Sequence, residues 1–319
     1  MVRGGRKWAN LTEEACADVY EILGLLGATS ANGLSQHERW RVVVRGVTVA
    51  AYRNGTIYMP PKPGADSMLV SAAIEELVST PFVGTDRTFL VGFDESGKSE
   101  IAGATVVAGV VVPNQVAHEV EHLLGTSETK THKQPGYFDR LYEGMIPLLD
   151  RGVRMAVRRI QPDLIDSYNV TGLLDVTYAE LARELIEGLP VDTVRLAADD
   201  YGIRGPFKRF LDDAKRQGGE VFIATKADDR FIEVRAASIF ARHERERVVE
   251  EMNADERWQI NGLGIGAGHW GQPDTLAWVT AWKDTRADWP PFIRRSAKPI
   301  RNLDGLTRVT KPYPPGHAL

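Results

Sequence analysis

"VGFDESGKSEIAGATVVAGVVVP", residues 91–113, places two acidic side chains inside the most strand-like part of the chain. Asp94 and Glu95 end a short apolar run, a Gly-Lys-Ser turn follows them, and a long segment of small apolar residues follows the turn. The pattern predicts strands at 89–93 and 102–112, and the second is apolar enough to be buried on both faces. Acids at the end of such a strand need a neutralising partner or a function.

The composition of the 319-residue chain is that of a globular protein, with a net charge of −4 and one cysteine, Cys16. A single cysteine excludes a disulfide framework within the chain and is typical of the cytoplasm, where we expect the protein. The longest apolar run is much shorter than the roughly 20 residues of a membrane span, so we expect no membrane contact. The net charge argues against a surface that is basic throughout. The segment 292–311 is nevertheless basic, and it is either a solvated tail or a patch that docks a polyanion.

Two sequence patterns divide the chain. Residues 1–82 contain helical spacing at 11–26, two or three short strands separated by glycine turns, and helical spacing at 68–80, which predicts a small α+β domain. From residue 88 to 319, strands alternate with helices, which indicates an α/β domain with a basic C-terminal segment. Its strands are expected at 89–93, 102–112, 153–160, 193–202 and 220–229, and its helices at 137–149, 173–187, 205–217 and 233–253.

Acidic pairs occur at the ends of three of these strands. Asp199 and Asp200 end the strand at 193–202, and Asp228 and Asp229 end the strand at 220–229. Sites in α/β sheets are built at strand ends, so we expect these acids to converge with the first pair. Asp199 is preferred over Asp200 because the apolar run before it marks the end of the strand.

A cluster of carboxylates requires a counter-charge. At about 4 Å, two like charges repel by roughly 4 kcal/mol at an effective dielectric near 20. Carboxylate oxygens favour Mg²⁺ or Mn²⁺, and a pair of such ions is suited to phosphodiester hydrolysis. The alternative is that each acid caps a helix or stabilises a turn. The joint occurrence of the three pairs, with a glycine turn after the first, favours a metal-dependent site.

Several motifs resemble those of ribonucleases HII and HIII. "DESGKSEIAG" at 94–103 resembles the first acidic motif of that family, and "KADDRFIEVRAASIFAR" at 226–242 resembles the last. "RLAADDYG" at 195–202 resembles the middle strand, which ends in the third acid. The resemblance covers most of residues 88–300 and is closer to ribonuclease HIII. Ribonuclease HII has a tyrosine, used to recognise an isolated ribonucleotide, at the position where this chain has Gln272.

The resemblance implies a fold, a reaction and a set of site residues. The fold is a ribonuclease H-like mixed sheet flanked by helices, preceded at 1–82 by a small α+β domain that resembles TATA-binding protein and binds substrate. The reaction is hydrolysis of the RNA strand of an RNA–DNA hybrid by a monomer with two divalent ions, leaving a 5′-phosphate and a 3′-hydroxyl. The implied catalytic and metal-binding residues are Asp94, Glu95, Asp199 and Asp228. The implied substrate-binding residues are Gly97, Lys98, Ser99, Lys130, Arg294 and Arg295.

One departure from the family pattern affects the turn that reads RNA. Ser99 stands where the family has glycine. In the family the backbone of this turn contacts 2′-hydroxyl groups, so we expect the extra Cβ to crowd the substrate.

Two alternatives to a ribonuclease H function remain open: a nucleic-acid-binding protein of the same fold with attenuated catalysis, and a resolvase-type DNA endonuclease. The four acids favour an enzyme, and the Gly-Lys-Ser turn and the Ala-Ala-Ser-Ile helix argue against a resolvase.

Overall fold

The chain divides into two compact units, Met1–Pro81 and Phe82–Leu319. The computed structural model describes all residues except 1–4, 9–10, 12, 32–34, 79–81, 126–135, 286–287 and 318–319. Lys130, a predicted substrate-binding residue, lies outside the described residues. Among the helices that are described, none is both long enough and apolar enough to cross a membrane.

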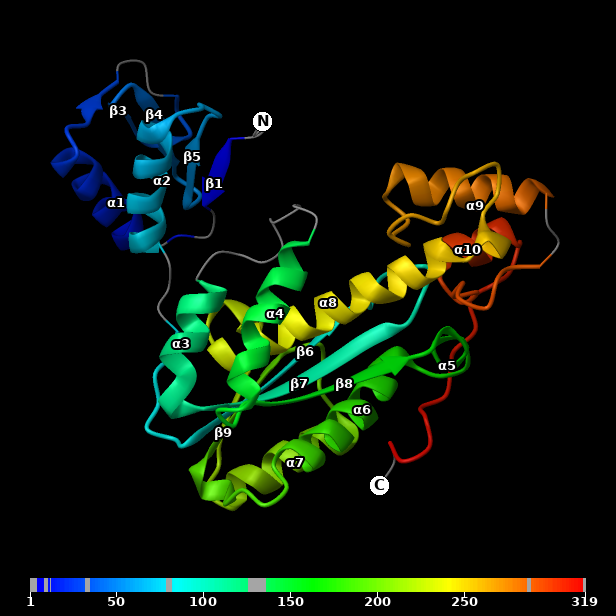
Figure 1. Cartoon of the computed structure of the whole chain (residues 1–319). Coiled ribbons are helices and arrows are strands. Elements are labelled where there is room, and N and C mark those ends of the chain that lie inside the picture. The colour runs from blue at the N-terminus through cyan, green and yellow to red at the C-terminus, as the bar shows by residue number, and fades with distance from the viewer. Residues whose placement is uncertain are drawn as a thin grey trace. The chain divides into compact units, whose positions relative to one another are not determined.

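The first unit is an antiparallel sheet with two helices. Its strands are β1 (Arg6–Trp8), β2 (Thr29–Ser30), β3 (Glu38–Val44), β4 (Val47–Tyr52) and β5 (Thr56–Met59), in the order β1-β5-β4-β3-β2. Helices α1 (Glu13–Leu25) and α2 (Ala65–Val78) share one apolar core with β3, β4 and β5 (Figure 1). The prediction identified both helices and these three strands. It left out β1 and β2, which are too short to show an alternating pattern.

The second unit contains a five-stranded mixed sheet, which confirms the predicted fold class. Its strands are β6 (Phe89–Ser96), β7 (Thr105–Pro113), β8 (Arg154–Ile160), β9 (Val194–Asp199) and β10 (Glu220–Ala224). They lie in the order β10-β9-β6-β7-β8. β10, β9 and β6 are parallel, whereas β7 and β8 run antiparallel to their neighbours. β6, which carries the opening acidic pair, therefore lies at the centre of the sheet.

Helices cover both faces of this sheet. They are α3 (Asn114–Leu124), α4 (Tyr137–Leu149), α5 (Pro162–Ser167), α6 (Val170–Leu185), α7 (Gly205–Arg216), α8 (Ile232–Ala254), α9 (Pro273–Thr285) and α10 (Lys298–Leu303). α3, α4 and α8 lie on one face, and α6 and α7 lie on the other (Figure 1). Each face has its own apolar core, and every residue of β7 is buried, as the sequence predicted.

Side chains of β6 alternate between the two faces, and this alternation places the acids. Val91 and Phe93 belong to the core beneath α6 and α7. Gly92 faces α8 so closely that a Cβ atom there would lie 2.1 Å from the carbonyl carbon of Glu233. Because successive side chains of a strand point to opposite faces, Asp94 continues the α8 side of the strand and Glu95 the α6 side.

The structure corrects the prediction for the last acidic pair. β10 ends at Ala224, and Asp228 lies beyond it in the 3-10 turn η3 (Ala227–Asp229). Lys226 interrupts the strand with a left-handed backbone conformation, φ 54°. Asp228 is therefore carried by a turn between β10 and α8 rather than by a strand end. The prediction also left out α3, α5, α9 and α10, and it began β7 three residues too early.

The close approach of α8 to β6 predicts that Gly92→Ala destabilises the second unit. We expect a loss of at least about 2 kcal/mol in the free energy of unfolding, because the new methyl group meets the backbone of α8 and not a flexible side chain. Urea unfolding followed by circular dichroism measures this loss. Gly84→Ala is the matched control, because a Cβ atom there has no neighbour within 4 Å. Equal stability of the two variants would contradict the packing described.

Candidate active site

Asp94 has a carboxyl group whose pKa is shifted by burial and by two neighbouring acids. Burial of its carboxyl group, together with repulsion from Glu95 and Asp228, raises the pKa of Asp94 to about 8. A hydrogen bond from the Ser238 side chain, on α8, acts in the opposite direction and favours the ionised form. Three of the four predicted acids, Asp94, Glu95 and Asp228, therefore lie close enough near the end of β6 for Glu95 and Asp228 to repel the charge of Asp94.

Glu95 is held on the other side of β6 by two polar groups. The Tyr178 hydroxyl, on α6, donates to Glu95 Oε2 at 2.6 Å. Lys98 Nζ lies 3.4 Å from Glu95 Oε1, so this predicted substrate-binding lysine turns toward the acids. Burial and the negative charge of Glu95 raise the pKa of Tyr178 well above its ordinary value, which keeps its hydroxyl group a donor.

The third acid lies on the neighbouring strand. In the parallel register of β6 and β9, Phe93 pairs with Ala198, so Asp199 follows directly beside the end of β6. Asp199 Oδ1 accepts a hydrogen bond from the backbone N–H of Ala227 at 3.1 Å, which directs it toward the turn η3. Asp200 is exposed and its Oδ1 accepts from the backbone of Gly202, the geometry of an ordinary turn residue. The placement favours Asp199 as the site residue.

The turn that carries Asp228 is fixed by a buried arginine. Arg235 has a side chain that is 1% exposed, and its Nε donates to the carbonyl oxygen of Asp228 at 2.8 Å. Its Nη1 donates to the carbonyl oxygen of Gly125 at 2.8 Å, and its Nη2 lies 3.4 Å from Asp229 Oδ1. Asp228 itself is 5% exposed. Arg235 therefore holds both acids of η3 through one planar group.

Two buried arginines support the turn between β6 and β7. Arg245, on α8, pairs with Glu100 and donates to the carbonyl oxygen of Ala102 at 2.9 Å. Arg294 donates through Nε to Gly103 O at 2.8 Å and through Nη1 to Lys98 O at 3.2 Å. Burial and repulsion by Arg245 lower the pKa of Arg294 to about 10. Since Arg294 is 2% exposed, the structure corrects the prediction that it contacts phosphate, and it supports the turn from beneath.

The turn itself is shaped by one glycine. Gly97 has φ +81°, and a Cβ atom there would lie 3.0 Å from Arg245 Nε, so glycine is required by both conformation and space. Ser99 is exposed and does not have a positive φ, so its backbone does not require glycine. Arg295 is exposed. Its backbone N–H donates to Asp166 Oδ2 at 2.9 Å, and its Nη2 donates to the carbonyl oxygen of Trp289 at 3.3 Å.

The donor set fits a hard divalent cation. All four acids supply carboxylate oxygens, the ligands that Mg²⁺ and Mn²⁺ prefer. Burial of its carboxyl group and repulsion from Glu95 and Asp228 raise the pKa of Asp94, and a bound cation would favour its ionised form. Within the residues that the structure describes, no three His, Cys, Asp or Glu side chains form a complete ligand group by themselves. Metal binding would therefore draw the carboxylates closer together.

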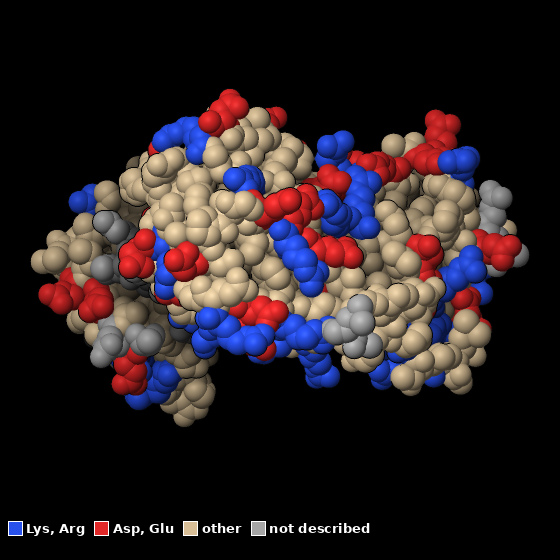
Figure 2. Space-filling model, turned by 90° about the horizontal axis from the view of Figure 1, so that it is seen from below, with Lys and Arg blue, Asp and Glu red and all other residues tan. Residues whose placement is uncertain are grey.

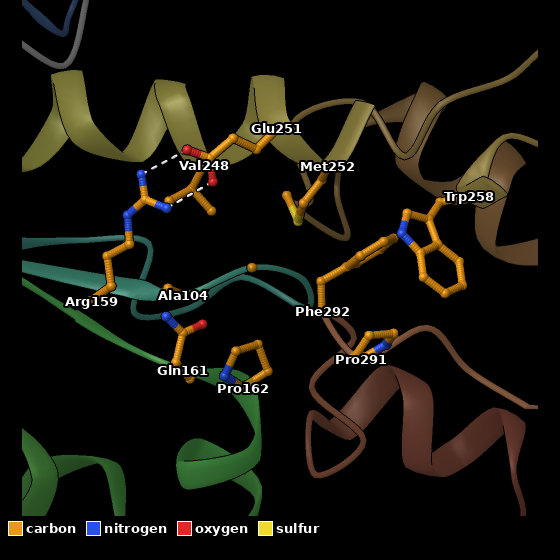
Figure 3. A pocket seen from close by; sticks show the side chains of 11 residues that line it. Ala104, Arg159, Gln161, Pro162, Val248, Glu251, Met252, Trp258, Pro291 and Phe292 are labelled. Atoms are coloured by element: carbon orange, nitrogen blue, oxygen red, sulfur yellow. Dashed lines mark hydrogen bonds and ion pairs between the residues drawn. The ribbon is translucent and has the colours of Figure 1, made fainter. Parts of the chain in front are cut away.

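One cavity of the second unit is separate from these acids. It has a volume of about 290 Å³ and lies beside Gly103 and Ala104, which lead from the supported turn into β7. Figure 3 shows Met252 and Phe292 projecting toward it, with the Arg159–Glu251 ion pair at one wall. No predicted catalytic residue lines it.

The face covered by α6 and α7 is not a uniform basic surface. Figure 2 shows Lys and Arg side chains interspersed with Asp and Glu side chains over this face. Ion pairs such as Arg158–Glu184 and Lys208–Asp212 account for part of the mixture. A polyanion would therefore gain little by binding there, in agreement with the net charge of −4.

The sequence reasoning missed several residues that shape the site. They are Tyr178, Arg235, Ser238 and Arg245. Ser238 and Arg245 lie seven residues apart on α8, a spacing that places them on one helix face, and this spacing was a usable signal. Nothing in the local sequence indicates that Tyr178 reaches Glu95, which lies 83 residues away in the chain.

Comparisons with known proteins agree on one family. The sequence profile of the family described as ribonuclease HII matches residues 91–297, all within the second unit. Ribonuclease HII of Thermococcus onnurineus is 29% identical over 220 residues, which cover 67% of this chain and 89% of that protein. Ribonuclease HII of Saccharolobus solfataricus is 28% identical over 222 residues, covering 69% and 96%. The crystal structure of ribonuclease H2 from Pyrococcus horikoshii OT3 superposes with a TM-score of 0.55 at 23% identity, covers 68% and 97%, and shares the fold.

The repulsion at Asp94 predicts that Asp94→Asn stabilises the metal-free protein. The substitution removes the charge that burial and two neighbouring acids disfavour, so we expect a rise in melting temperature of about 4 °C in the presence of a chelator. Added Mg²⁺ should raise the melting temperature of the wild type more than that of the variant. Asp200→Asn is the control, because its carboxylate is exposed. A lower melting temperature in Asp94→Asn would show that the charge of Asp94 is not disfavoured by its burial and by its acidic neighbours.

Proposed function

The chain belongs to the ribonuclease HII family, and from this premise we propose that it is an endonuclease that hydrolyses the RNA strand of RNA–DNA hybrids. The family profile covers the acidic motifs at both ends of the site. The observation that carries the proposal is the electrostatic coupling of Asp94 to Glu95 and Asp228, which come from different segments of the fold. Asp199 follows on the strand beside Asp94.

We propose that these four carboxylates hold two divalent ions, Mg²⁺ or Mn²⁺, with Asp94 shared between them. When bound, such ions lower the pKa of a water molecule and neutralise charge on the leaving oxygen. The chain's own groups fix the carboxylates before the substrate arrives. Ser238 orients Asp94, and Tyr178 orients Glu95. The products would be a 5′-phosphate and a 3′-hydroxyl.

We propose that the turn Gly97-Lys98-Ser99 selects RNA. The positive φ of Gly97 bends the backbone at the end of β6, and Arg294 fixes the carbonyl oxygen of Lys98 from below. Because the carbonyl oxygens of this turn are held from inside the fold, its outer surface is rigid. This surface can recognise a 2′-hydroxyl group of the RNA strand. The exposed Ser99 side chain lies on this surface, and Arg295 supplies a cation for phosphate.

We further propose that substrate preference follows ribonuclease HIII. The position that carries the tyrosine of ribonuclease HII is Gln272 here, an exposed residue whose backbone N–H donates to the carbonyl oxygen of His269 at 3.0 Å. An amide side chain cannot stack on a sugar or base as an aromatic ring does. Excision of single embedded ribonucleotides should therefore be weak compared with hybrid cleavage.

The first unit is proposed to bind the duplex. The register of its sheet places Lys7, Tyr58, Ala50 and Arg41 in one row across β1, β5, β4 and β3. The residues next to this row, such as Val42 and Val49, face the core formed with α1 and α2, so the row lies on the other face of the sheet. Cations beside an aromatic ring suit a nucleic-acid backbone. The arrangement fits the expected resemblance to TATA-binding protein.

We also propose that the chain acts as a monomer in the cytoplasm. Its single cysteine, Cys16, is buried and free. Burial raises the pKa of the Cys16 thiol, which keeps it protonated and unreactive, as suits a reducing compartment.

The proposed function predicts cleavage of an RNA–DNA hybrid in the presence of Mg²⁺ or Mn²⁺ and its loss in Asp94→Asn. We expect the substitution to lower the rate at least about 100-fold, because it removes the shared ligand. Gel analysis of end-labelled hybrid and of plain DNA measures the rates. Asp200→Asn, which changes the neighbour of Asp199, should retain activity. Hybrid that is bound but never cut would contradict the assignment and favour a binding protein.

The identity of residue 272 predicts the second substrate preference. A DNA duplex with one ribonucleotide should be cut at least about tenfold more slowly than a hybrid, the effect of losing one stacking contact of about 1–3 kcal/mol. Gln272→Tyr should reduce the difference between the cleavage rates on these two duplexes. Equal rates on the two duplexes with the wild type would contradict the preference while leaving the hydrolase assignment in place.

A further inference from the structure

The C-terminal segment is docked against the start of α6 in the second unit. Asn169 N–H donates to the carbonyl oxygen of Pro312 at 2.8 Å, and Lys311 Nζ donates to Ser296 Oγ at 2.5 Å. The ring of Tyr313 fills the space left by Gly172, where a Cβ atom would lie 2.5 Å from Tyr313 Cδ1. The segment therefore has a defined position, although its described residues, up to 317, form no helix or strand after α10.

His317, near the end of this segment, reaches a buried carboxylate. Its Nε2 lies 3.1 Å from Oδ2 of Asp175, a residue of α6 that is 0% exposed. Because a carboxylate only accepts hydrogen bonds, Nε2 carries the hydrogen. Tyr313 stacks on the His317 ring at 4.1 Å, and Gly205 leaves room for it, since a Cβ atom there would lie 2.5 Å from Nε2. The pocket for His317 is thus shaped on several sides.

The other oxygen of Asp175 anchors the loop that follows Asp199. Asp175 Oδ1 accepts from the Tyr201 hydroxyl at 3.0 Å and from the backbone N–H of Arg204 at 3.0 Å. These two donors bracket the loop between β9 and α7. A buried carboxylate requires such donors, because burial alone raises the pKa of Asp175 and disfavours its charged form.

Tyr201 connects this anchor to Glu95. Its ring stacks on Tyr178 with centroids 5.2 Å apart and an interplanar angle of 17°. Tyr178 donates to Glu95 at 2.6 Å, and Lys98 Nζ, which also approaches Glu95, lies 5.0 Å above the Tyr201 ring. A continuous set of contacts therefore runs from the C-terminal segment through Asp175, Tyr201 and Tyr178 to Glu95.

We propose that His317 is a positioning residue for the catalytic acids: through Asp175 and Tyr201 it fixes the loop after Asp199 and the tyrosine pair that orients Glu95. The inference rests on the proposed function. Without His317, Asp175 Oδ2 loses its hydrogen-bond donor. A buried carboxylate oxygen without a donor is unfavourable, so the Asp175 side chain would shift toward water. Tyr201 and Arg204 are bonded to the same carboxylate and would move with it.

His317→Ala in the full chain tests this role. We expect the Mg²⁺ concentration that gives half of the metal-induced rise in melting temperature to increase about tenfold, the lower end of effects seen for residues that support metal ligands. The turnover rate on an RNA–DNA hybrid should fall by a similar factor, with KM for the hybrid unchanged. His317→Gln, whose amide nitrogen can take the place of Nε2, should restore both values to within about twofold.

Three further measurements make the outcome decisive. His118→Ala, at an α3 residue whose side chain is 92% exposed, should change neither value. Tyr201→Phe breaks the bond to Asp175 while keeping the ring, and should raise the half-saturating Mg²⁺ concentration even if His317→Ala folds poorly. Deletion of residues 312–319 should match His317→Ala.

One result for His317→Ala would overturn the inference: a lower melting temperature with an unchanged half-saturating Mg²⁺ concentration and an unchanged turnover rate. His317 would then contribute to packing alone. An unchanged half-saturating Mg²⁺ concentration in Tyr201→Phe would also overturn the inference. A wild type that binds Mg²⁺ and cleaves no hybrid would contradict the proposed function alone, since the Mg²⁺ titration would still report on His317.

Discussion

The site depends on keeping like charges together at the end of one strand. Asp94 is half-buried beside Glu95 and Asp228, and burial of its carboxyl group together with repulsion from these acids raises its pKa. The strand holds the first two acids apart on opposite sides, and separate elements then hold each of them. α8 approaches β6 closely enough, at Gly92, for Ser238 to reach Asp94. α6 supplies Tyr178 to Glu95 on the other side. The helices on the two faces of the sheet therefore each hold one of these two acids.

Buried arginines provide the second support. Arg235 fixes the turn that carries Asp228, and Arg245 and Arg294 fix the segment from Lys98 to Gly103. Each donates mainly to backbone carbonyl oxygens, so each determines the path of the chain rather than the charge of the site. A planar group with five donors is suited to this task. The buried arginines therefore stabilise the scaffold of the site.

The strand and helix pattern made most of the second unit predictable, because its elements are long and strongly apolar. The alternation of β6 also explains why a sequence motif as short as Asp94-Glu95 was informative. Asp228 was misplaced because Lys226 adopts a left-handed conformation that no residue type at that position signals. Arg294 was misread because a basic segment looks exposed until its packing is known. The contacts of Tyr178 and His317 join positions 83 and 142 residues apart, so no local pattern could reveal them.

The central claim is that the four acids form one metal-binding centre at the end of β6. Anomalous diffraction from crystals soaked in Mn²⁺ tests it directly. The account predicts Mn²⁺ bound between Asp94, Glu95, Asp199 and Asp228, with Tyr178 still bonded to Glu95. Mn²⁺ found only elsewhere on the protein, or bound by Asp200 in place of Asp199, would contradict it.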